Sequence, residues 1–129
     1  MKFLVDTSVL VDHLRGDARA TKLLSELFRS DEVIGSVMSR TEIRAGMRAA
    51  EKRGTERLLN TLTWIPVDVE IADRAGELAR RYRTSHPSLD TVDYVIAATV
   101  VVNEVAFYTR NVKHFPMIKG LRDAYSTSV

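Results

Sequence analysis

Three acidic residues stand in nearly apolar stretches far apart in the chain, each at the start of a predicted helix. They are Asp6, Glu42 and Asp93. A carboxylate beside a hydrophobic core is costly unless something positive compensates its charge. Because the three come from distant segments, one shared divalent metal ion would account for all of them. The chemistry that such a site predicts is phosphodiester hydrolysis, in which the metal activates water and stabilises the attacking and leaving oxygens.

The metal that these residues favour is Mg²⁺ or Mn²⁺. Both ions prefer oxygen ligands, whereas zinc is commonly held by cysteine and histidine. The chain of 129 residues has no cysteine, and its three histidines, at positions 13, 86 and 114, have no ligand spacing to one another. We therefore interpret His13, His86 and His114 as structural or surface residues.

Each carboxylate also has a structural explanation. Asp6 could cap a helix or end a strand. The segment 39–42 matches a capping box, in which Glu42 would accept a hydrogen bond from the Ser39 amide. Asp90 lies three residues before Asp93 on the same helical face, and one of the two could be only a solvated charge near a helix N-terminus. We assign that role to Asp90.

Predicted strands and helices alternate along the chain. Apolar segments rich in β-branched residues predict strands at 2–5, 32–37, 63–67 and 105–108. Helices are expected at about 9–15, 18–29, 39–50, 55–62, 69–82 and 92–102, with Ser88 as the cap that precedes the last of them. This alternation predicts an α/β protein with a twisted, mainly parallel sheet of four to five strands and helices on both faces. We expect a single domain over residues 1–129.

In such sheets, ligands bind beyond the carboxyl ends of the strands. Asp6 directly follows the first predicted strand, and Glu42 lies in the helix after the second. Asp93 begins a helix, and Asn111 follows the fourth strand. The fold therefore allows all four residues to converge on one edge of the sheet.

The composition favours an ordinary globular protein with a ligand rich in phosphate. No apolar run reaches the roughly 20 residues of a membrane span, so we expect no membrane partner. The absence of cysteine fits a reducing cytosol, so we expect a cytoplasmic protein. Fourteen of the 19 basic residues are arginine, whose planar guanidinium matches phosphate geometry. Arg40, Arg44 and Arg48 recur every fourth residue on the predicted Glu42 helix. They form either a track for a nucleic-acid backbone or a solvated arginine face.

Four sequence segments, taken in order, carry a family resemblance. They are Val5–Leu10, Thr41–Ile43, Asp93–Thr99 and Thr109–Asn111, the last followed by His114-Phe115. Together they resemble the PIN-domain ribonucleases, most closely the VapC toxins of toxin–antitoxin pairs. The resemblance implies a Mg²⁺- or Mn²⁺-dependent endoribonuclease that is the toxin of a type II module. It also implies a homodimer that a cognate antitoxin inhibits by placing a segment across the acidic site, with DNA bound only through that antitoxin.

The resemblance also assigns residues. Asp6, Glu42 and Asp93 match the metal ligands. Many members carry aspartate where this chain has Asn111, whose amide oxygen keeps a ligand but removes a negative charge, so the number of metals stays open. Secondary candidates are Asp90, Thr7 and Thr109, and the RNA contacts are Arg40, Arg44, Arg48 and Arg110.

Two other classes of protein compete with this interpretation: aspartate phosphohydrolases or receiver domains, which also place aspartate at strand ends, and RNA-binding domains without catalysis. An aspartate phosphohydrolase would need a second aspartate two residues after Asp6, where Ser8 stands. A receiver domain would need an acidic pair before its phosphoacceptor and a lysine after a late strand, and neither is evident. A catalytically silent RNA-binding domain of the same fold would have no need of three intact acidic residues.

Overall fold

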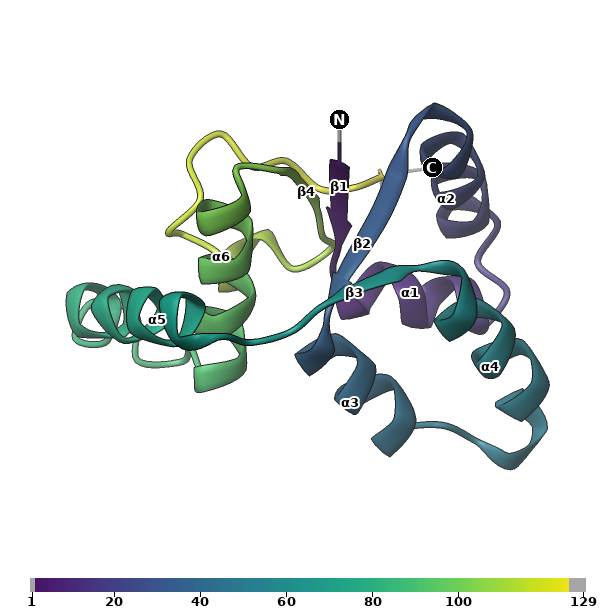
Figure 1. Cartoon of the computed structure of the whole chain (residues 1–129), viewed down its shortest axis with the longest axis horizontal. Helices are drawn as coiled ribbons and strands as arrows, with labels where there is room; N and C mark the ends of the chain where they lie inside the picture. Colours follow the sequence, from purple (N-terminus) through teal and green to yellow (C-terminus); the bar gives the residue numbers. More distant parts are fainter. Residues whose placement is uncertain (1, 126–129) are drawn as a thin grey trace.

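In the computed structural model, which describes residues 2–125, four strands form one parallel sheet (Figure 1). The strands are β1 (Lys2–Val5), β2 (Glu32–Ser36), β3 (Thr63–Ile65) and β4 (Ala106–Tyr108), in the order β3-β2-β1-β4. The register pairs Leu4 with both Ile34 and Phe107. The predicted α/β class and the parallel sheet are confirmed. Beyond β4, a single parallel bridge between Thr109 and Asp123 takes the place of a fifth strand among the described residues.

Within the described part of the chain, six α-helices connect and cover these strands. They are α1 (Thr7–Leu14), α2 (Ala18–Ser30), α3 (Val37–Ala45), α4 (Lys52–Thr61), α5 (Val69–Tyr82) and α6 (Thr91–Asn103). Two short 3₁₀ turns, η1 (Ala49–Glu51) and η2 (Val112–His114), complete the elements. Within residues 2–125, no helix is long and apolar enough to cross a membrane.

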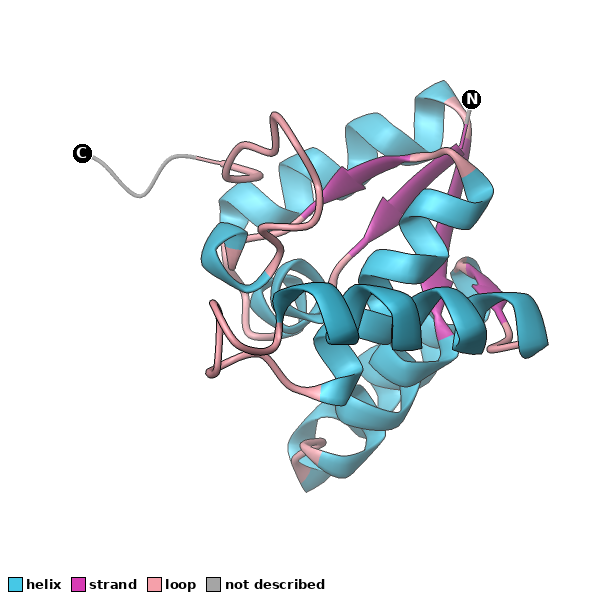
Figure 2. Ribbon diagram, turned by 90° about the vertical axis from the view of Figure 1, so that its left-hand side faces the viewer, coloured by secondary structure: helices cyan, strands magenta, loops and turns pink. Residues whose placement is uncertain are grey.

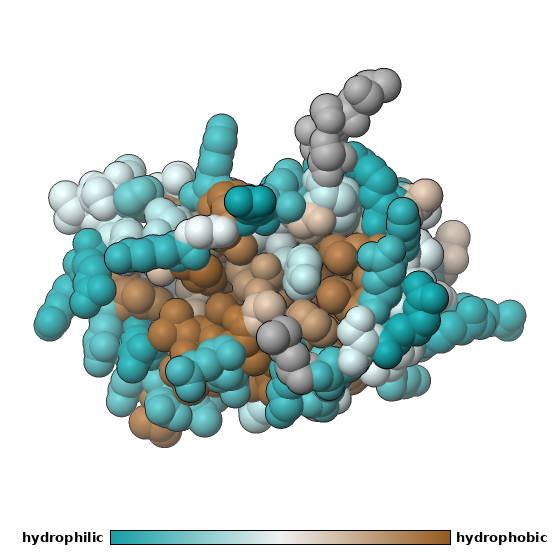
Figure 3. Space-filling model, turned by 90° about the horizontal axis from the view of Figure 1, so that it is seen from above, coloured by the Kyte–Doolittle hydropathy of each residue, from teal (hydrophilic) through white to brown (hydrophobic). Residues whose placement is uncertain are grey.

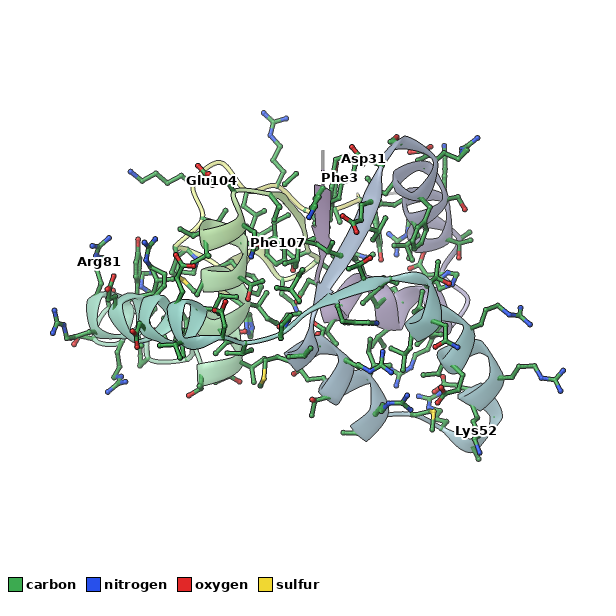
Figure 4. The ribbon with its side chains drawn as sticks, viewed as in Figure 1. Phe3, Asp31, Lys52, Arg81, Glu104 and Phe107 are labelled. Atoms are coloured by element: carbon green, nitrogen blue, oxygen red, sulfur yellow. The ribbon has the colours of Figure 1, made fainter. Side chains whose placement is uncertain are left out.

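The sheet separates two hydrophobic layers, as the alternation of strand side chains requires. Leu4, Ile34 and Phe107 pack with α5 and α6 on one face. Val5 and Val33 pack with α1, α2 and α4 on the other. Figure 2 shows helices on both sides of the strands, and Figure 4 shows Phe107 between β4 and α6. The strand sequences are therefore nearly continuous runs of apolar residues, because helices cover both faces of the sheet.

The order of the strands creates a switch point beside β1. From β1 the chain moves outward through β2 to β3, and then returns through α5 and α6 to place β4 on the other side of β1. The connections after β1 and β4 therefore leave in opposite directions. In parallel sheets, this is the place where ligands bind, beyond the carboxyl ends of the strands.

Four helix starts differ from the sequence predictions, and α4 begins at Lys52 rather than at residue 55. The helix predicted from residue 39 begins at Val37, because the Ser36 side chain caps it by accepting from the Met38 amide at 3.1 Å. It ends at Ala45 rather than near residue 50. The last helix is capped by Asp90 and not by Ser88. The first begins at Thr7, two residues earlier than expected.

The end of the sheet where the strands begin carries apolar surface. Seen from above, hydrophobic side chains are exposed on this face between hydrophilic margins (Figure 3). A hollow of about 410 Å³ separates β4 from the segment 118–123. The polar residues that could perform chemistry lie elsewhere, at the opposite ends of the strands.

Gly35 in β2 is required by the ring of Trp64 on the neighbouring strand. A Cβ atom at Gly35 would lie 2.7 Å from Trp64 Cζ3. The ring cannot move easily, because its Nε1 donates to the Leu59 carbonyl at 2.7 Å. We predict that Gly35→Ala lowers the free energy of unfolding by about 1–3 kcal/mol, the usual cost of overpacking. Urea unfolding measures this change.

Gly54 provides the matched control. It lies in α4 with open space around its Cα, so Gly54→Ala should keep or raise stability. An equal loss of stability in both variants would show that Trp64 is not the cause.

Candidate active site

A cavity of about 560 Å³ opens at the carboxyl ends of the strands, at the switch point between β1 and β4. Five acidic residues line it, namely Asp6, Asp12, Glu42, Asp90 and Asp93. They come from the end of β1 and from α1, α3 and the start of α6. The remaining polar lining residues are Thr7, Ser8, Arg110, Asn111 and His114. The structure thus brings Asp6, Glu42, Asp93 and Asn111 to one cavity.

Asp6 is held in the floor of the cavity by the backbone and by two hydroxyl groups. Its amide donates to the Tyr108 carbonyl at 2.9 Å, which extends the pairing of β1 with β4. Its Oδ2 accepts from Thr109 Oγ1 at 2.7 Å and from Ser8 Oγ at 2.9 Å. Asp6 is only 4% exposed, and although it occupies the N-cap position of α1, its side chain caps no amide. The helix-cap explanation therefore does not account for this buried carboxylate.

Glu42 is tied to α1 by Thr7. The Thr7 hydroxyl lies 2.8 Å from Glu42 Oε1 and 2.8 Å from Ser39 Oγ. Since Ser36 caps α3, the predicted capping box between Ser39 and Glu42 does not form. Glu42 instead directs its carboxylate towards the cavity across the gap between α3 and α1.

A capping box does form at Asp93, where the sequence did not indicate one. Asp90 Oδ1 accepts from the Asp93 amide at 3.0 Å, and Asp93 Oδ2 accepts from the Asp90 amide at 3.1 Å. Asp93 is 9% exposed, whereas Asp90 is exposed. His114 Nδ1 lies 3.2 Å from Asp93 Oδ2. Asp93 therefore has a structural role and a place in the cavity wall at the same time.

Burial and mutual repulsion disfavour the charged forms of two of these carboxyls. Burial raises the pKa of Glu42 above its ordinary value, and the charges of Asp6, Asp90 and Asp93 raise it further against the bond from Thr7. Burial likewise raises the pKa of Asp93, with the Asp90 charge adding to it and His114 opposing it. A bound cation would relieve both effects.

Arg110 borders the cavity and is held by groups on α1 and in the C-terminal segment. Its Nη1 lies 3.3 Å from Asp12 Oδ2, and its Nε forms an ion pair with Asp123 Oδ1 at 2.7 Å. Its guanidinium stacks 4.4 Å from the centre of the Tyr125 ring. The Tyr125 hydroxyl donates to Asp12 Oδ2 at 2.5 Å, and burial raises the pKa of Tyr125 to about 12. These contacts fix Arg110 in place.

The other predicted arginines do not line the cavity. Arg40 stacks on Trp64 at 5.4 Å, and Arg44 pairs with Glu56 at 2.7 Å. Arg48 lies beyond the end of α3, so the expected stripe of three arginines on one helix is wrong at its third position.

Two of the secondary candidate residues, Thr7 and Thr109, lie closer to the acidic cavity than these arginines. Thr7 lines the cavity, whereas Thr109 is buried and reaches it through Asp6.

Three cavity residues were missed in the sequence. Ser8 and Asp12 lie four residues apart, so they share the face of α1 that follows Asp6, and that spacing could have revealed them. His114 was interpreted as a structural or surface residue. Its side chain is 50% exposed but contacts Asp93, a pairing that only the fold creates.

The donor set fits a hard divalent ion by its chemistry. Carboxylate and amide oxygens are the ligands that Mg²⁺ and Mn²⁺ prefer. Asp6 Oδ1 and Glu42 Oε2 accept no hydrogen bond from residues 2–125, so both retain free lone pairs. Over the same residues, no three acidic or histidine side chains already lie close enough to hold one ion. Side-chain movement would accompany metal binding.

We predict that Asp93→Asn leaves the metal-free fold as stable as the wild type or more stable at neutral pH. Asparagine keeps an oxygen that can accept from the Asp90 amide but removes the charge. Because the pKa of Asp93 is raised on folding, the folded state binds the proton more tightly than the unfolded state. The stability contributed by this group is therefore present at acidic pH and is lost as pH rises through the folded pKa. Urea unfolding in EDTA at several pH values should show that the free energy of unfolding falls less with rising pH in Asp93→Asn than in the wild type.

Asp93→Ala is the control, because it also removes the acceptor for the Asp90 amide. It should be less stable than Asp93→Asn by about 1 kcal/mol. A large loss of stability in Asp93→Asn would show that the charge itself supports the fold.

Comparison with known proteins identifies the family. The PIN domain profile matches residues 3–115. Ribonuclease VapC19 of Mycobacterium tuberculosis is 44% identical over 123 residues, which cover 95% of this chain and 98% of that protein. Ribonuclease VapC1 of Methanocaldococcus jannaschii is 29% identical, with 92% and 82% covered.

Solved structures agree with these sequence relationships. A chain from a toxin–antitoxin complex of Klebsiella pneumoniae superimposes with a TM-score of 0.77 at 27% identity, covering 95% of this chain and 97% of the other. A chain of the DNA-bound VapBC2 complex of Rickettsia felis shares the fold, with a TM-score of 0.81 at 18% identity over 94% and 96% of the two chains. The sequence profile, the curated relatives and the architecture agree, and the chain belongs to the PIN domain family.

Proposed function

We propose that this protein is an endoribonuclease that depends on Mg²⁺ or Mn²⁺ and acts as the toxin of a type II toxin–antitoxin module. One observation carries the proposal, namely the acidic cavity at the switch point of the sheet, into which buried Asp6 presents its carboxylate. Curated relatives at 44% and 42% identity bear the name ribonuclease, which supports the choice of RNA as substrate. We take residues 1–129 as one catalytic domain.

In this proposal Asp6, Glu42 and Asp93 would hold the ion, and Asn111 would add a neutral oxygen. The ion would supply positive charge to the scissile phosphate and to the attacking water. Thr109 and Ser8 orient Asp6, and Thr7 orients Glu42. Asp90 acts as a positioning residue, since it accepts from the amide of Asp93. Each of the three proposed carboxylate ligands therefore accepts a hydrogen bond that limits its rotation.

Contacts to RNA would begin at Arg110, the predicted arginine that borders the cavity. Its charge is balanced by Asp12 and Asp123, so it would act as a fixed donor at the rim. Arg40, Arg44 and Arg48 would meet only more distant phosphates. We retain them as predicted contacts outside the site.

The proposed partners are a cognate antitoxin and a second copy of the chain. Solved relatives are chains of toxin–antitoxin complexes, some of them bound to DNA. An antitoxin would inhibit by placing a segment across the acidic cavity, and it would supply any binding to DNA. A catalytically silent RNA-binding protein or a different metal-dependent phosphohydrolase is disfavoured, because the acidic residues are intact and the curated relatives are ribonucleases.

We predict that the purified protein cleaves RNA with Mg²⁺ or Mn²⁺ and stops when EDTA is added. Glu42→Gln should keep the fold and lose most activity, because the neutral amide binds Mg²⁺ weakly while it can still accept from Thr7. Cleavage of a mixed cellular RNA pool, followed by mapping of the new ends, measures both effects and identifies the target.

The matched variant is Ser36→Ala, which removes the cap of α3 without touching the cavity. It should cost about 1 kcal/mol of stability and leave cleavage largely intact. If Glu42→Gln cleaved at the wild-type rate at limiting Mg²⁺, Glu42 would not be a ligand. Undiminished cleavage in EDTA would remove the metal from the mechanism.

We predict that expression of the chain alone arrests growth and that co-expression of the protein encoded beside it restores growth. Asp6→Ala should abolish the arrest at equal protein level, which immunoblotting checks. Growth curves after induction provide the measurement. Equal arrest by both versions would separate toxicity from the acidic site.

A further inference from the structure

The segment that follows β4 is basic. Between residues 110 and 122 it carries four lysine or arginine residues and no aspartate or glutamate. In Figure 1 it forms the yellow-green and yellow loops beside α6 and β4, and its apolar residues pack into the core of that layer. The first part of this segment, residues 110–114, borders the acidic cavity through Arg110, Asn111 and His114.

A second hollow adjoins the same part of the segment. Its volume is about 420 Å³, and it is lined by residues 110–114 together with Asp123. Arg110, Asn111 and His114 line both this hollow and the acidic cavity, so the two spaces are neighbours that share one wall. We call the second space the basic hollow. It is large enough for a nucleotide, since sites for small molecules commonly measure about 300–1,000 Å³.

The two neighbouring spaces differ in charge. The acidic cavity is lined by five acidic residues and by Arg110. Among residues 2–125, the basic hollow is lined by Arg110, Lys113 and one carboxylate, that of Asp123, whose Oδ1 lies 2.7 Å from Arg110 Nε. Lys113 is exposed and forms no ion pair with any residue between 2 and 125. Its ammonium group is therefore available to an anion.

Arg110 occupies a fixed position on the wall between the two spaces. Its Nε and Nη1 pair with Asp123 and Asp12, and its guanidinium stacks on the Tyr125 ring. Its Nη2 has no hydrogen-bond partner in the described part of the chain. One guanidinium nitrogen thus remains for an anion that passes from one space to the other.

An RNA strand with one phosphate at the proposed metal must lead its neighbouring phosphates away from the carboxylates. One divalent ion offsets only part of the charge of five acidic residues, so the acidic cavity would repel a second phosphate. The basic hollow is an adjoining space of the opposite charge. A neighbouring phosphate placed there would meet Lys113 and Arg110, and hydrogen bonds between such cations and phosphate are strong.

We propose that the basic hollow binds the RNA phosphate next to the one at the metal, with Lys113 as a direct contact and Arg110 on the boundary. The inference rests on the proposed function, because the acidic cavity fixes the strand at its other end. Contacts to phosphate fix the register of a nucleic acid but read no bases. Lys113 would therefore strengthen binding and position the strand without selecting a sequence.

The absence of cysteine from the chain allows a test at a single side chain. Lys113→Cys removes the ammonium group and introduces one thiol. Alkylation of that thiol with 2-bromoethylamine then restores an amine at nearly the same distance from the backbone as in lysine. Binding is measured by fluorescence anisotropy with a labelled oligouridylate in EDTA, so that affinity is the readout rather than metal-dependent cleavage.

Lys113→Cys should weaken binding of the oligouridylate by about two- to fivefold, the range of one exposed ion pair. It should also reduce the slope of log affinity against log salt concentration by about 0.7, the value for one phosphate contact on a single strand. Alkylation should restore both quantities. The wild-type protein, which has no thiol, is treated in the same way to control for alkylation at other groups.

Lys119→Cys is the matched control. Lys119 is an exposed lysine of the same segment, but it lines the hollow beside β4 and not the basic hollow. The affinity of this variant for the oligouridylate should equal that of the wild type before and after alkylation. Circular dichroism verifies folding of both variants, and mass spectrometry verifies the addition of one aminoethyl group to each.

Four results would each overturn the proposal. They are a wild type that does not bind the oligouridylate, a Lys113→Cys variant that binds as tightly as the wild type, an equal loss in Lys119→Cys, and a loss that alkylation does not restore. If binding changes as expected but the protein cleaves no RNA with Mg²⁺ or Mn²⁺, the proposed function fails, whereas the basic hollow remains a binding site for RNA phosphate.

Discussion

Electrostatic repulsion among carboxylates is the constraint on which this structure depends. Asp6, Glu42 and Asp93 line one cavity, where Asp6 and Asp93 are buried and Glu42 is exposed, and partial loss of hydration raises the pKa of Glu42 and Asp93. A protein selected only for stability would replace such residues, since unpaired buried charge is costly. Their presence is explained if a divalent cation joins them, because its charge reverses the sign of the interaction. The rest of the fold serves to hold these groups near one another.

Two kinds of contact provide that restraint. The backbone contributes the parallel pairing of β1 with β4, which places Asp6 beside Thr109 at the switch point. Hydroxyl groups then fix the carboxylates, with Thr109 and Ser8 on Asp6 and Thr7 on Glu42. Hydroxyls serve this purpose well because they donate to a carboxylate without neutralising it, so the negative charge remains available to a metal. At the start of α6, the capping box of Asp90 and Asp93 fixes both carboxylates through hydrogen bonds from backbone amides, which likewise leave the negative charge in place.

The sequence alone predicts the class of fold and most of the proposed ligands, and physical reasons limit the rest. Strand and helix periodicity locates β1, β2 and α5 because their apolar patterns are strong. The start of α3 was misplaced because Ser36 and Ser39 are both good capping residues, and only the position of β2 decides between them. A separate error extended the predicted helix through Gly46, which is the C-cap of α3, and so placed Arg48 on it. His114 was missed because its place in the cavity depends on its contact with Asp93, 21 residues away in the sequence, which local spacing cannot reveal.

The central claim is that the clustered carboxylates bind a divalent metal, and direct measurement of Mn²⁺ binding tests it most simply. Titration calorimetry on the metal-free protein at neutral pH should detect saturable binding in the wild type. Asp6→Asn should abolish or greatly weaken that binding while circular dichroism remains unchanged. If the wild type bound no Mn²⁺, or if Asp6→Asn bound it as tightly, the acidic cavity would not be a metal site and the account would fail.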